Sequence, residues 1–325
     1  MKTFACLCVL VGALFTAPRA GAQVFTIAVL PDTQCEVNRQ EAMFTSQMRW
    51  LVENKDALHI PVVLHVGDII DWDTPDHRMW ETASRGFALL DTAGLPYALA
   101  NGNHDNAAVK IGGSAAPGNV NANLRITTLF NRYFPPARFK LQRGAYEPGK
   151  SENSFCTFSA GGVDWLVLAL ELWPRQGVID WAKTVTVTHP DHNVIVLTHS
   201  FLTSRGNIKA DNGGYGDTSP LWLSEQLIRP YANMRFVLSG HVDTSAWRVE
   251  HGAHGNTVYE ILQDCQLTDE GGGYIRLLEV DVQKKTVSAR MYSPYYDLTK
   301  EDQSRFRFEE VELIPPVRKA GEEAL

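Results

Sequence analysis

The feature that most constrains this chain is the stretch 61–105, in which two short apolar runs each end at glycine beside acidic and amide side chains. Short apolar runs that stop at such a cluster are typical of buried strands. The polar groups follow the runs in the order Gly67-Asp68-Ile69-Ile70-Asp71 and Gly102-Asn103-His104-Asp105. The sequence therefore predicts two strand ends that carry metal-ligand chemistry.

A helix is predicted between these two strands, over residues 75–93, because apolar residues recur there at helical spacing and Gly94 is suited to end it. A strand, a helix and a second strand in this order form a right-handed crossover with parallel neighbours. We therefore expect Asp68 and Asn103 at the same carboxyl edge of one sheet. Open α/β sheets bind their ligands at this edge.

The beginning of the chain has the pattern of a secretory signal peptide. A positive charge at Lys2 precedes an apolar core over residues 4–17, and Ala20-Gly21-Ala22 forms an A-x-A cleavage signal. We expect residues 1–22 to be removed and the protein to be secreted or periplasmic. An uncleaved anchor is the alternative, but the apolar core is shorter than the roughly twenty residues that a spanning helix needs. No membrane span is expected after cleavage.

The rest of the chain is predicted to form one α/β domain over residues 23–314. Residues 106–153 interrupt the strand and helix pattern, and long insertions of this kind often act as lids or binding loops. Residues 251–314 are expected to be rich in β-strands, and residues 315–325 to be a loose tail. The net charge of −7 gives no basic footprint, so general nucleic-acid binding is not expected.

Five predicted strand ends carry candidate metal ligands. Carboxylate, amide and imidazole groups together suit Mn²⁺, Fe²⁺, Zn²⁺ or Mg²⁺, and no cysteine lies in these motifs. One such group alone is more often a turn residue or a structural histidine, so the prediction of a metal site depends on the presence of five such strand ends. The candidates are Asp32 with Gln34, Asp68, Asn103, His199, and His241 with Asp243.

In this order the motifs resemble those of the calcineurin-like metallophosphoesterase superfamily, which read D-x-H, G-D-x-x-D, G-N-H-[DE], H and G-H-x-H. The resemblance runs from Asp32 to Asp243. It implies an α/β fold, namely a four-layer α/β/β/α sandwich of two mixed β-sheets flanked by helices. The D-x-Q form of the first motif also resembles a branch of secreted bacterial members.

The resemblance further implies a role for each residue. Asp32, Gln34 and Asp243 would hold a first metal, while Asn103, His199 and His241 would hold a second. Asp68 would bridge the two ions, which in such sites lie about 3.5–4 Å apart and share an activated hydroxide. That hydroxide would attack phosphorus, and His104 would protonate the leaving oxygen. Either Asp71 or Asp105 would orient the imidazole of His104.

Two residues depart from the family pattern, and both belong to the first metal. Gln34 replaces the usual histidine, and Asp243 replaces the second histidine of the last motif. This half of the site becomes richer in oxygen, which favours Mn²⁺, Fe²⁺ or Mg²⁺ over Zn²⁺, and we expect Mn²⁺ first. The alternative is a degenerate site that binds one ion or none. Arg205 is a candidate for holding substrate phosphate.

The sequence thus predicts a dinuclear metal-dependent phosphatase or phosphodiesterase that acts on a small phosphate ester. It leaves the choice between monoesters and diesters open, together with the oligomeric state and the pairing of Cys35, Cys156 and Cys265. One alternative is a catalytically degenerate binding protein on the same fold, with its insertion recognising a ligand. Another is an extracellular nuclease, which the acidic balance disfavours.

Overall fold

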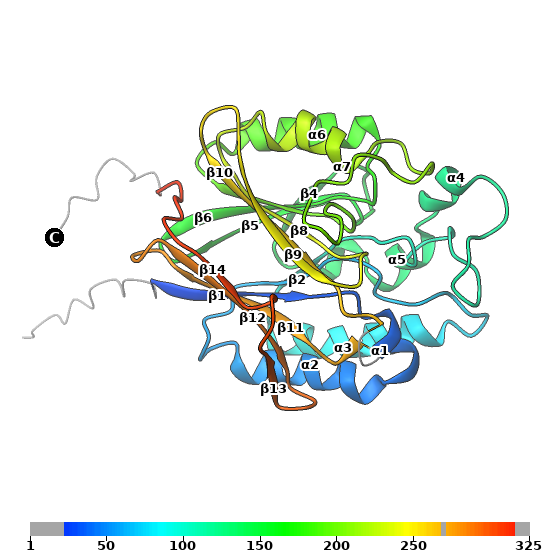
Figure 1. The fold of residues 1–325 in the computed structure, drawn as a ribbon. Helices are drawn as coiled ribbons and strands as arrows, with labels where there is room; N and C mark the ends of the chain where they lie inside the picture. Colours follow the sequence, from blue (N-terminus) through cyan, green and yellow to red (C-terminus); the bar gives the residue numbers. More distant parts are fainter. Residues whose placement is uncertain (1–22, 268–270, 316–325) are drawn as a thin grey trace, which may run out of the picture.

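In a computed structural model of the protein, the described residues are 23–267 and 271–315. The predicted leader and residues 316–325 of the predicted tail lie outside them. Two mixed β-sheets pack face to face, with helices on their outer faces (Figure 1). This arrangement confirms the predicted α/β/β/α sandwich. Within the described part of the chain, no helix is both long enough and apolar enough to cross a membrane.

The first sheet has the strand order β13-β12-β11-β1-β2-β3, and β14 also pairs with β12. The strands β1, β2 and β3 are parallel to one another, as the strand and helix pattern predicts, whereas β11 is antiparallel to β1. The bounds are β1 (Val24–Leu30), β2 (Val63–His65), β3 (Tyr97–Leu99), β11 (Ile275–Asp281), β12 (Thr286–Ser293), β13 (Leu298–Lys300) and β14 (Phe306–Phe308).

The second sheet has the order β4-β5-β6-β7-β8-β10-β9. The strands β6, β7, β8 and β10 are parallel, and antiparallel strands complete both edges. The bounds are β4 (Gln142–Ala145), β5 (Ser154–Ala160), β6 (Val163–Ala169), β7 (Asn193–Leu197), β8 (Met234–Ser239), β9 (Ser245–His251) and β10 (Thr257–Gln263).

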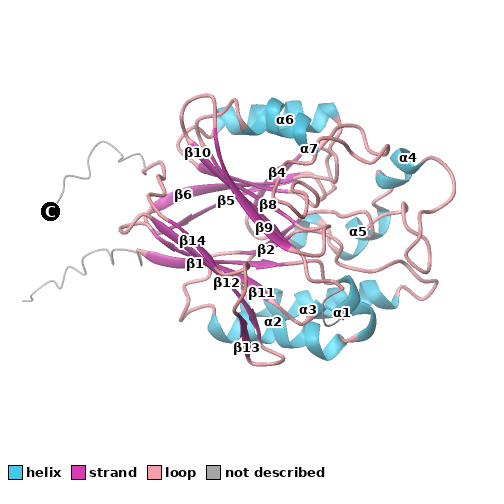
Figure 2. Cartoon of the chain, viewed as in Figure 1, coloured by secondary structure: helices cyan, strands magenta, loops and turns pink. Residues whose placement is uncertain are grey.

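Helices cover the two outer faces (Figure 2). The first sheet is covered by α1 (Gln34–Arg39), α2 (Glu41–Asn54) and α3 (Arg78–Ala93). The second is covered by α6 (Gln176–Thr188), α7 (Pro220–Leu223) and a π-helical turn (Ser224–Ile228). The insertion contains α4 (Val120–Leu124), α5 (Thr128–Tyr133) and a 3₁₀ turn (Pro136–Arg138). It lies at the end of the sandwich opposite the beginning of β1 (Figure 1).

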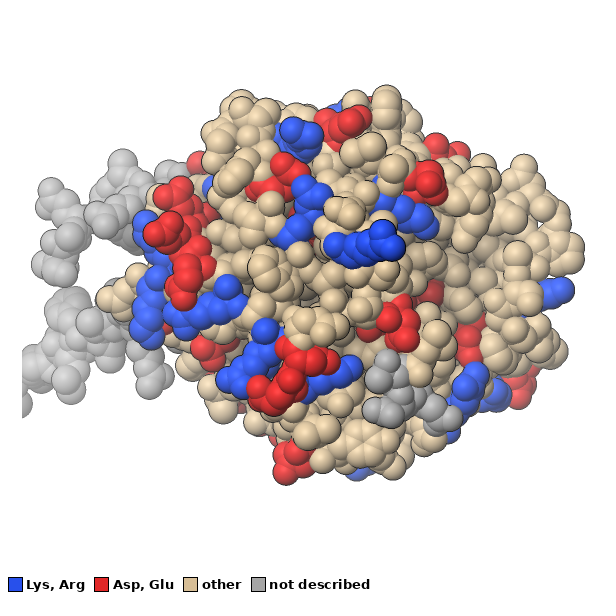
Figure 3. Space-filling model, in the orientation of Figure 1, with Lys and Arg blue, Asp and Glu red and all other residues tan. Residues whose placement is uncertain are grey.

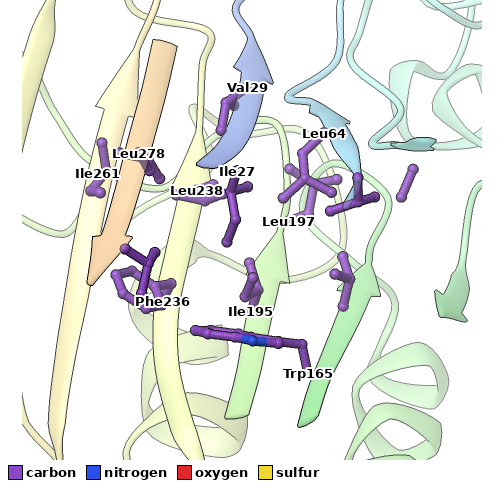
Figure 4. Close-up of a cluster of buried hydrophobic side chains, with 14 of the residues drawn as sticks. Ile27, Val29, Leu64, Trp165, Ile195, Leu197, Phe236, Leu238, Ile261 and Leu278 are labelled. Atoms are coloured by element: carbon purple, nitrogen blue, oxygen red, sulfur yellow. The ribbon is translucent and has the colours of Figure 1, made fainter. Parts of the chain in front are cut away.

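The layer between the two sheets is a continuous apolar core. Trp165, Ile195 and Phe236 of the second sheet face Ile27 and neighbouring residues of the first (Figure 4). These side chains are almost fully buried. Because burial of apolar surface supplies most of the folding free energy, this layer fixes the position of one sheet relative to the other. It thereby fixes which strand ends meet.

The structure corrects several predicted boundaries. The crossover helix begins at Arg78 rather than at residue 75, and Gly94 ends it with a φ of 71°. The insertion is partly ordered into short helices, and its last part, β4, pairs with β5. Residues 251–314 contain the strands β10, β11, β12, β13 and β14. The three described cysteines, Cys35, Cys156 and Cys265, are buried and free.

Candidate metal centre

The carboxyl ends of strands from both sheets meet at one place. Asp32 follows β1 and Asp68 follows β2, while His199 and His241 follow β7 and β8 of the second sheet. A hydrogen bond joins the two sheets here, because Nδ1 of His199 lies 3.0 Å from the Val66 carbonyl oxygen. A carbonyl oxygen only accepts, so Nδ1 carries the proton and Nε2 is left to bind a ligand.

Three glycines allow these side chains to approach one another. A Cβ atom on Gly102 would lie 2.0 Å from Oδ1 of Asp68, and one on Gly240 would lie 1.9 Å from Oδ1 of Asp32. Gly67 has a φ of 103°, and a Cβ there would lie 2.8 Å from Nδ1 of His199. The glycine of each motif therefore makes room for a ligand that follows a different strand.

The residues predicted for the second metal form the most compact part of the centre. The ligand atoms of Asp68, His199 and His241 all lie within 4.8 Å of one another. Nε2 of His199 lies 3.1 Å from Oδ2 of Asp68 and 3.1 Å from Nδ1 of His241. Oδ1 of Asn103 is buried beside this group and has no hydrogen-bond partner among the described residues.

The residues predicted for the first metal are Asp32, Gln34 and Asp243. Oδ2 of Asp32 accepts the His241 backbone N–H at 3.0 Å, while its Oδ1 is buried without a partner among the described residues. Oε1 of Gln34 is likewise buried and without a partner there. Asp243 is half-buried, and its Oδ1 accepts the Leu267 N–H at 3.1 Å. Asp32 and Asp243 do not join the close group around Asp68 described above.

Asp264 is a further carboxylate at this edge, to which the sequence motifs assign no ligand role. It follows β10, which is parallel to β8, and Oδ1 accepts the Gln266 N–H at 2.9 Å. Oδ2 is buried and has no partner within the described part of the chain. The sequence signal is a strand that ends at an acidic residue, as in the other motifs, but the family pattern stops at Asp243.

These buried oxygens without hydrogen-bond partners indicate whether the residues present suit a bound metal. A buried carboxylate or amide oxygen without a hydrogen bond is costly, and a bound cation removes that cost. Oxygens of Asp32, Gln34, Asn103 and Asp264 are in this state around one edge. Together with the two imidazoles they form a mixed oxygen and nitrogen donor set that suits Mn²⁺, Fe²⁺ or Zn²⁺. The residues therefore fit a divalent metal centre.

The surroundings shift the pKa values of the two imidazoles, His199 and His241, in opposite directions. Burial alone would raise the pKa of Asp68, but the imidazoles of His199 and His104 outweigh burial and lower it. Burial would lower the pKa of His199, but the Asp68 carboxylate raises it instead. Burial and the neighbouring His199 lower the pKa of His241 to about 3. His241 is therefore neutral near pH 7, which is the form that binds metal.

His104 is the predicted general acid, and a hydrogen bond at Nδ1 fixes the orientation of its ring. Nδ1 is hydrogen bonded to the Asp71 carbonyl oxygen and lies 3.6 Å from Oδ1 of Asp71. Nε2 lies 4.0 Å from Oδ2 of Asp68. Because a carbonyl oxygen only accepts, Nδ1 carries its proton toward Asp71 and Nε2 points to the metal side. The catalytic role of His104 stays a prediction.

Asp71 and Asp105, the two candidates for orienting His104, occupy different places. Asp71 contacts the imidazole, and its own Oδ2 accepts a hydrogen bond from Asn38 Nδ2 at 2.9 Å. Asp105 instead accepts backbone N–H groups from Ile69 at 2.8 Å and Gly102 at 2.9 Å. Asp105 thus ties the two motif loops together, and the orienting position belongs to Asp71.

Arg205, the predicted phosphate-binding residue, is exposed in a turn in which Gly206 N–H bonds to the Thr203 carbonyl at 2.9 Å. Another cation lies beside the centre. Nζ of Lys209 lies 5.2 Å from the Trp173 ring centroid, and the Trp173 ring lies 5.8 Å from that of His241. Motif reasoning missed Lys209, because it lies in a loop whose path depends on the second sheet.

We expect metal binding to strengthen as pH rises from about 6 to about 8. Burial raises the pKa of Asp264 to about 7, and burial with the Asp264 and Asp68 charges raises that of Asp32. Each carboxyl must lose its proton before it binds a cation, so binding releases protons and affinity increases with pH, on the order of tenfold. Calorimetric titration with Mn²⁺ at the two pH values measures this change.

The variant Asp264→Asn should flatten this pH dependence, whereas Asp211→Asn, an exposed residue of the loop 205–216, should leave it unchanged. A Mn²⁺ dissociation constant that does not vary with pH in the unmodified protein would contradict the expectation.

The sandwich and its donor set are those of an α/β protein whose candidate metal ligands come from the strand ends of both sheets. A family model described as Calcineurin-like phosphoesterase matches residues 25–244, more than half of the chain, and the chain belongs to this family. Family and donor set together support a metal-dependent phosphoesterase, which is a hydrolase.

Comparison with known proteins finds several that are similar to this chain. An uncharacterized protein of Bacillus subtilis, YvnB, is 29% identical over 284 residues, which cover 84% of this chain and 20% of that protein. The chain thus spans about one fifth of that relative's length. A dimetal phosphatase from Danio rerio matches 85% of this chain and 98% of its own, at 12% identity and a TM-score of 0.49. GAP50, the anchor in the inner membrane complex of Plasmodium, matches 89% of this chain and 90% of its own, at 10% identity and a TM-score of 0.40.

Proposed function

We propose that the protein hydrolyses small phosphate monoesters or diesters at a dinuclear metal centre. One observation carries the proposal. The close group of Asp68, His199 and His241 lies beside a histidine, His104, whose Nε2 is 4.0 Å from Oδ2 of Asp68. Metal-ligand atoms and a proton donor thus face the same space, as hydrolysis of an ester requires.

The proposed ligand set is the one that the family motifs imply. Asn103, His199 and His241 would hold one ion and Asp32, Gln34 and Asp243 the other, with Asp68 between them. Bound there, two divalent cations supply an activated water and neutralise charge on the phosphoryl oxygens. Asp264 adds a further oxygen donor on the side of Asp32. This oxygen-rich half favours Mn²⁺ over Zn²⁺.

His104 carries the proton that the leaving group needs. Its Nδ1–H is held by the Asp71 carbonyl, so Nε2 holds or releases the transferable proton. As the water oxygen bonds to phosphorus, the bond from phosphorus to the leaving oxygen breaks and keeps its electron pair on that oxygen. The proton on Nε2 of His104 passes to this oxygen, which leaves as an alcohol.

Cationic side chains would hold the remaining phosphate oxygens. Lys209 is the first candidate, because its Nζ lies 5.2 Å from the Trp173 ring centroid and that ring lies 5.8 Å from the ring of His241. Arg205 lies four residues earlier in the same loop and is exposed, so we retain it as a second candidate. A substrate phosphate bound between the metals and this loop would leave its ester oxygen facing His104.

The substrate is proposed to be small, and the protein to act outside the cytoplasm. The leader pattern of residues 1–22 supports export. Figure 3 shows acidic and basic side chains interspersed on one face, without a continuous basic surface there. That mixture and the net charge of −7 favour a small ester over a nucleic acid as the substrate.

The test is turnover of p-nitrophenyl phosphate and bis-p-nitrophenyl phosphate by metal-stripped protein to which Mn²⁺, Mg²⁺ or Zn²⁺ is returned. We expect activity to depend on added metal and to be highest with Mn²⁺, and the preferred ester distinguishes a phosphatase from a phosphodiesterase. Absence of metal-dependent turnover of either ester, together with no metal retained after purification, would favour a binding protein of the same fold.

A further inference from the structure

A cavity of about 300 Å³ lies beside His104, between the insertion, α3 and the loop that follows β2. Its walls are mainly apolar and come from three places: Ile70 follows β2, Trp80 belongs to α3, and Val109, Ile126 and Leu129 belong to the insertion. His104 is part of the lining. The cavity therefore adjoins the metal centre through the residue that is expected to protonate the leaving group.

The walls of the cavity are held by hydrogen bonds, so it is formed before any ligand arrives. The Ala107 N–H bonds to the Ile126 carbonyl at 3.2 Å, and the Ala116 N–H bonds to the Ala108 carbonyl at 2.7 Å. Arg125, next to Ile126, anchors the insertion to the loop that follows β6, through the Leu172 carbonyl at 3.0 Å. Pre-formed walls lower the entropy cost of binding a ligand.

An apolar side chain is left exposed at this cavity. Ile126 is 50% exposed although it lines a concave site next to the metal centre. Single exposed apolar residues are common, but one that lines a cavity beside His104 offers a contact surface for an apolar part of a ligand. The volume is at the lower end of the range for small-molecule sites, so the group must be compact.

We propose that this cavity binds the leaving group of the substrate, and that the preferred substrates are phosphate esters of compact, apolar alcohols, such as one with a single aromatic ring. The inference rests on the proposed function, because His104 must protonate the leaving oxygen. With that oxygen at Nε2 of His104, the carbon skeleton attached to it enters the cavity. The lining also includes Asp73, Asn106 and Lys110, but most of its surface is apolar. A strongly polar alcohol loses hydration against that apolar part of the wall, which disfavours it relative to an apolar one.

The experiment compares benzyl phosphate with ethyl phosphate, or their methyl diesters if the enzyme prefers diesters. The two alcohols are similar in acidity, so a difference in kcat/KM reports binding of the ring rather than leaving-group chemistry. We expect kcat/KM to be higher for the benzyl ester by at least about tenfold. The variant Ile126→Asn should lower this benzyl-to-ethyl ratio by about fivefold or more.

The matched control is Ile111→Asn. Ile111 belongs to the same insertion and is 59% exposed, but it does not line the cavity. This control should leave the ratio within about twofold of the unmodified protein. A second variant, Ala116→Phe, fills the cavity and should also lower the ratio. If circular dichroism shows that Ile126→Asn does not fold, the benzyl-to-ethyl ratio of Ala116→Phe tests the proposal instead.

The outcomes separate this proposal from the function it rests on. If neither p-nitrophenyl ester is hydrolysed with any metal, the proposed function fails and this proposal fails with it. If p-nitrophenyl esters are hydrolysed but benzyl and ethyl esters react equally well, only the cavity assignment is overturned. The assignment is also overturned if the ratio is unchanged in both cavity variants, or falls equally in Ile111→Asn.

Discussion

Replacement of Asp68 by asparagine is expected to lower kcat/KM by at least on the order of a thousandfold and to remove bound metal. Asp68 is buried, and its Oδ2 lies 3.1 Å from Nε2 of His199 while its Oδ1 accepts the His104 backbone N–H at 2.9 Å. No other carboxylate in the described residues joins both imidazole ligands in one close group. An amide has no charge with which to hold two cations together.

The measurement is metal content by mass spectrometry, made together with kcat/KM on the preferred p-nitrophenyl ester. The control is Asp76→Asn, since Asp76 is fully exposed before α3 and lies outside the centre. It should retain both metal and activity. Circular dichroism confirms that each variant is folded. An Asp68→Asn protein that keeps two ions per chain and loses less than about tenfold of its activity would show that Asp68 does not bridge the metals.

The variant His104→Gln is expected to lose activity in a way that depends on the leaving group. Loss of general-acid catalysis costs on the order of 10²–10⁴-fold when the alcohol is a poor leaving group. The loss should be much smaller for a p-nitrophenyl ester, because p-nitrophenolate leaves with little need for a proton. Metal content should not change, since His104 contacts Asp71 at Nδ1 and lies outside the close ligand group.

Comparing alkyl and p-nitrophenyl esters separates this role from a structural one. A residue that only supports the fold would lower both rates by the same factor. The control is His254→Gln, an exposed histidine in the turn between β9 and β10. Equal losses for both esters in His104→Gln, or a loss of metal, would contradict the role of general acid.

The sequence could predict the parts of the centre that depend on local pattern. Each motif joins an apolar strand to a glycine and a ligand, and these features are adjacent in the chain. The crossover from β2 through α3 to β3 then places Asp68 and Asn103 at one edge, because parallel strands end on the same side. The structure confirms this arrangement and the two mixed sheets.

The features of the fold and of the centre that the sequence did not predict depend on contacts between residues far apart in the chain. The strand β9 has alternating exposed residues such as Trp247, so it lacks the continuous apolar run that marks a buried strand. The place of Asp264 beside the candidate ligands depends on the parallel pairing of β10 with β8, which the sequence motifs do not determine. The choice between Asp71 and Asp105 likewise required the direction of a backbone carbonyl, which residue types do not determine.

The hydrogen bond from His199 to the Val66 carbonyl joins the ends of two separate sheets. The binding site therefore does not exist in either sheet alone, and a nascent chain with only its first half folded has no complete site. Ligands from Asp32 to Asp243 come together only when the last parallel strands have docked. Contacts so distant along the chain form slowly, so we expect the centre to be completed late in folding.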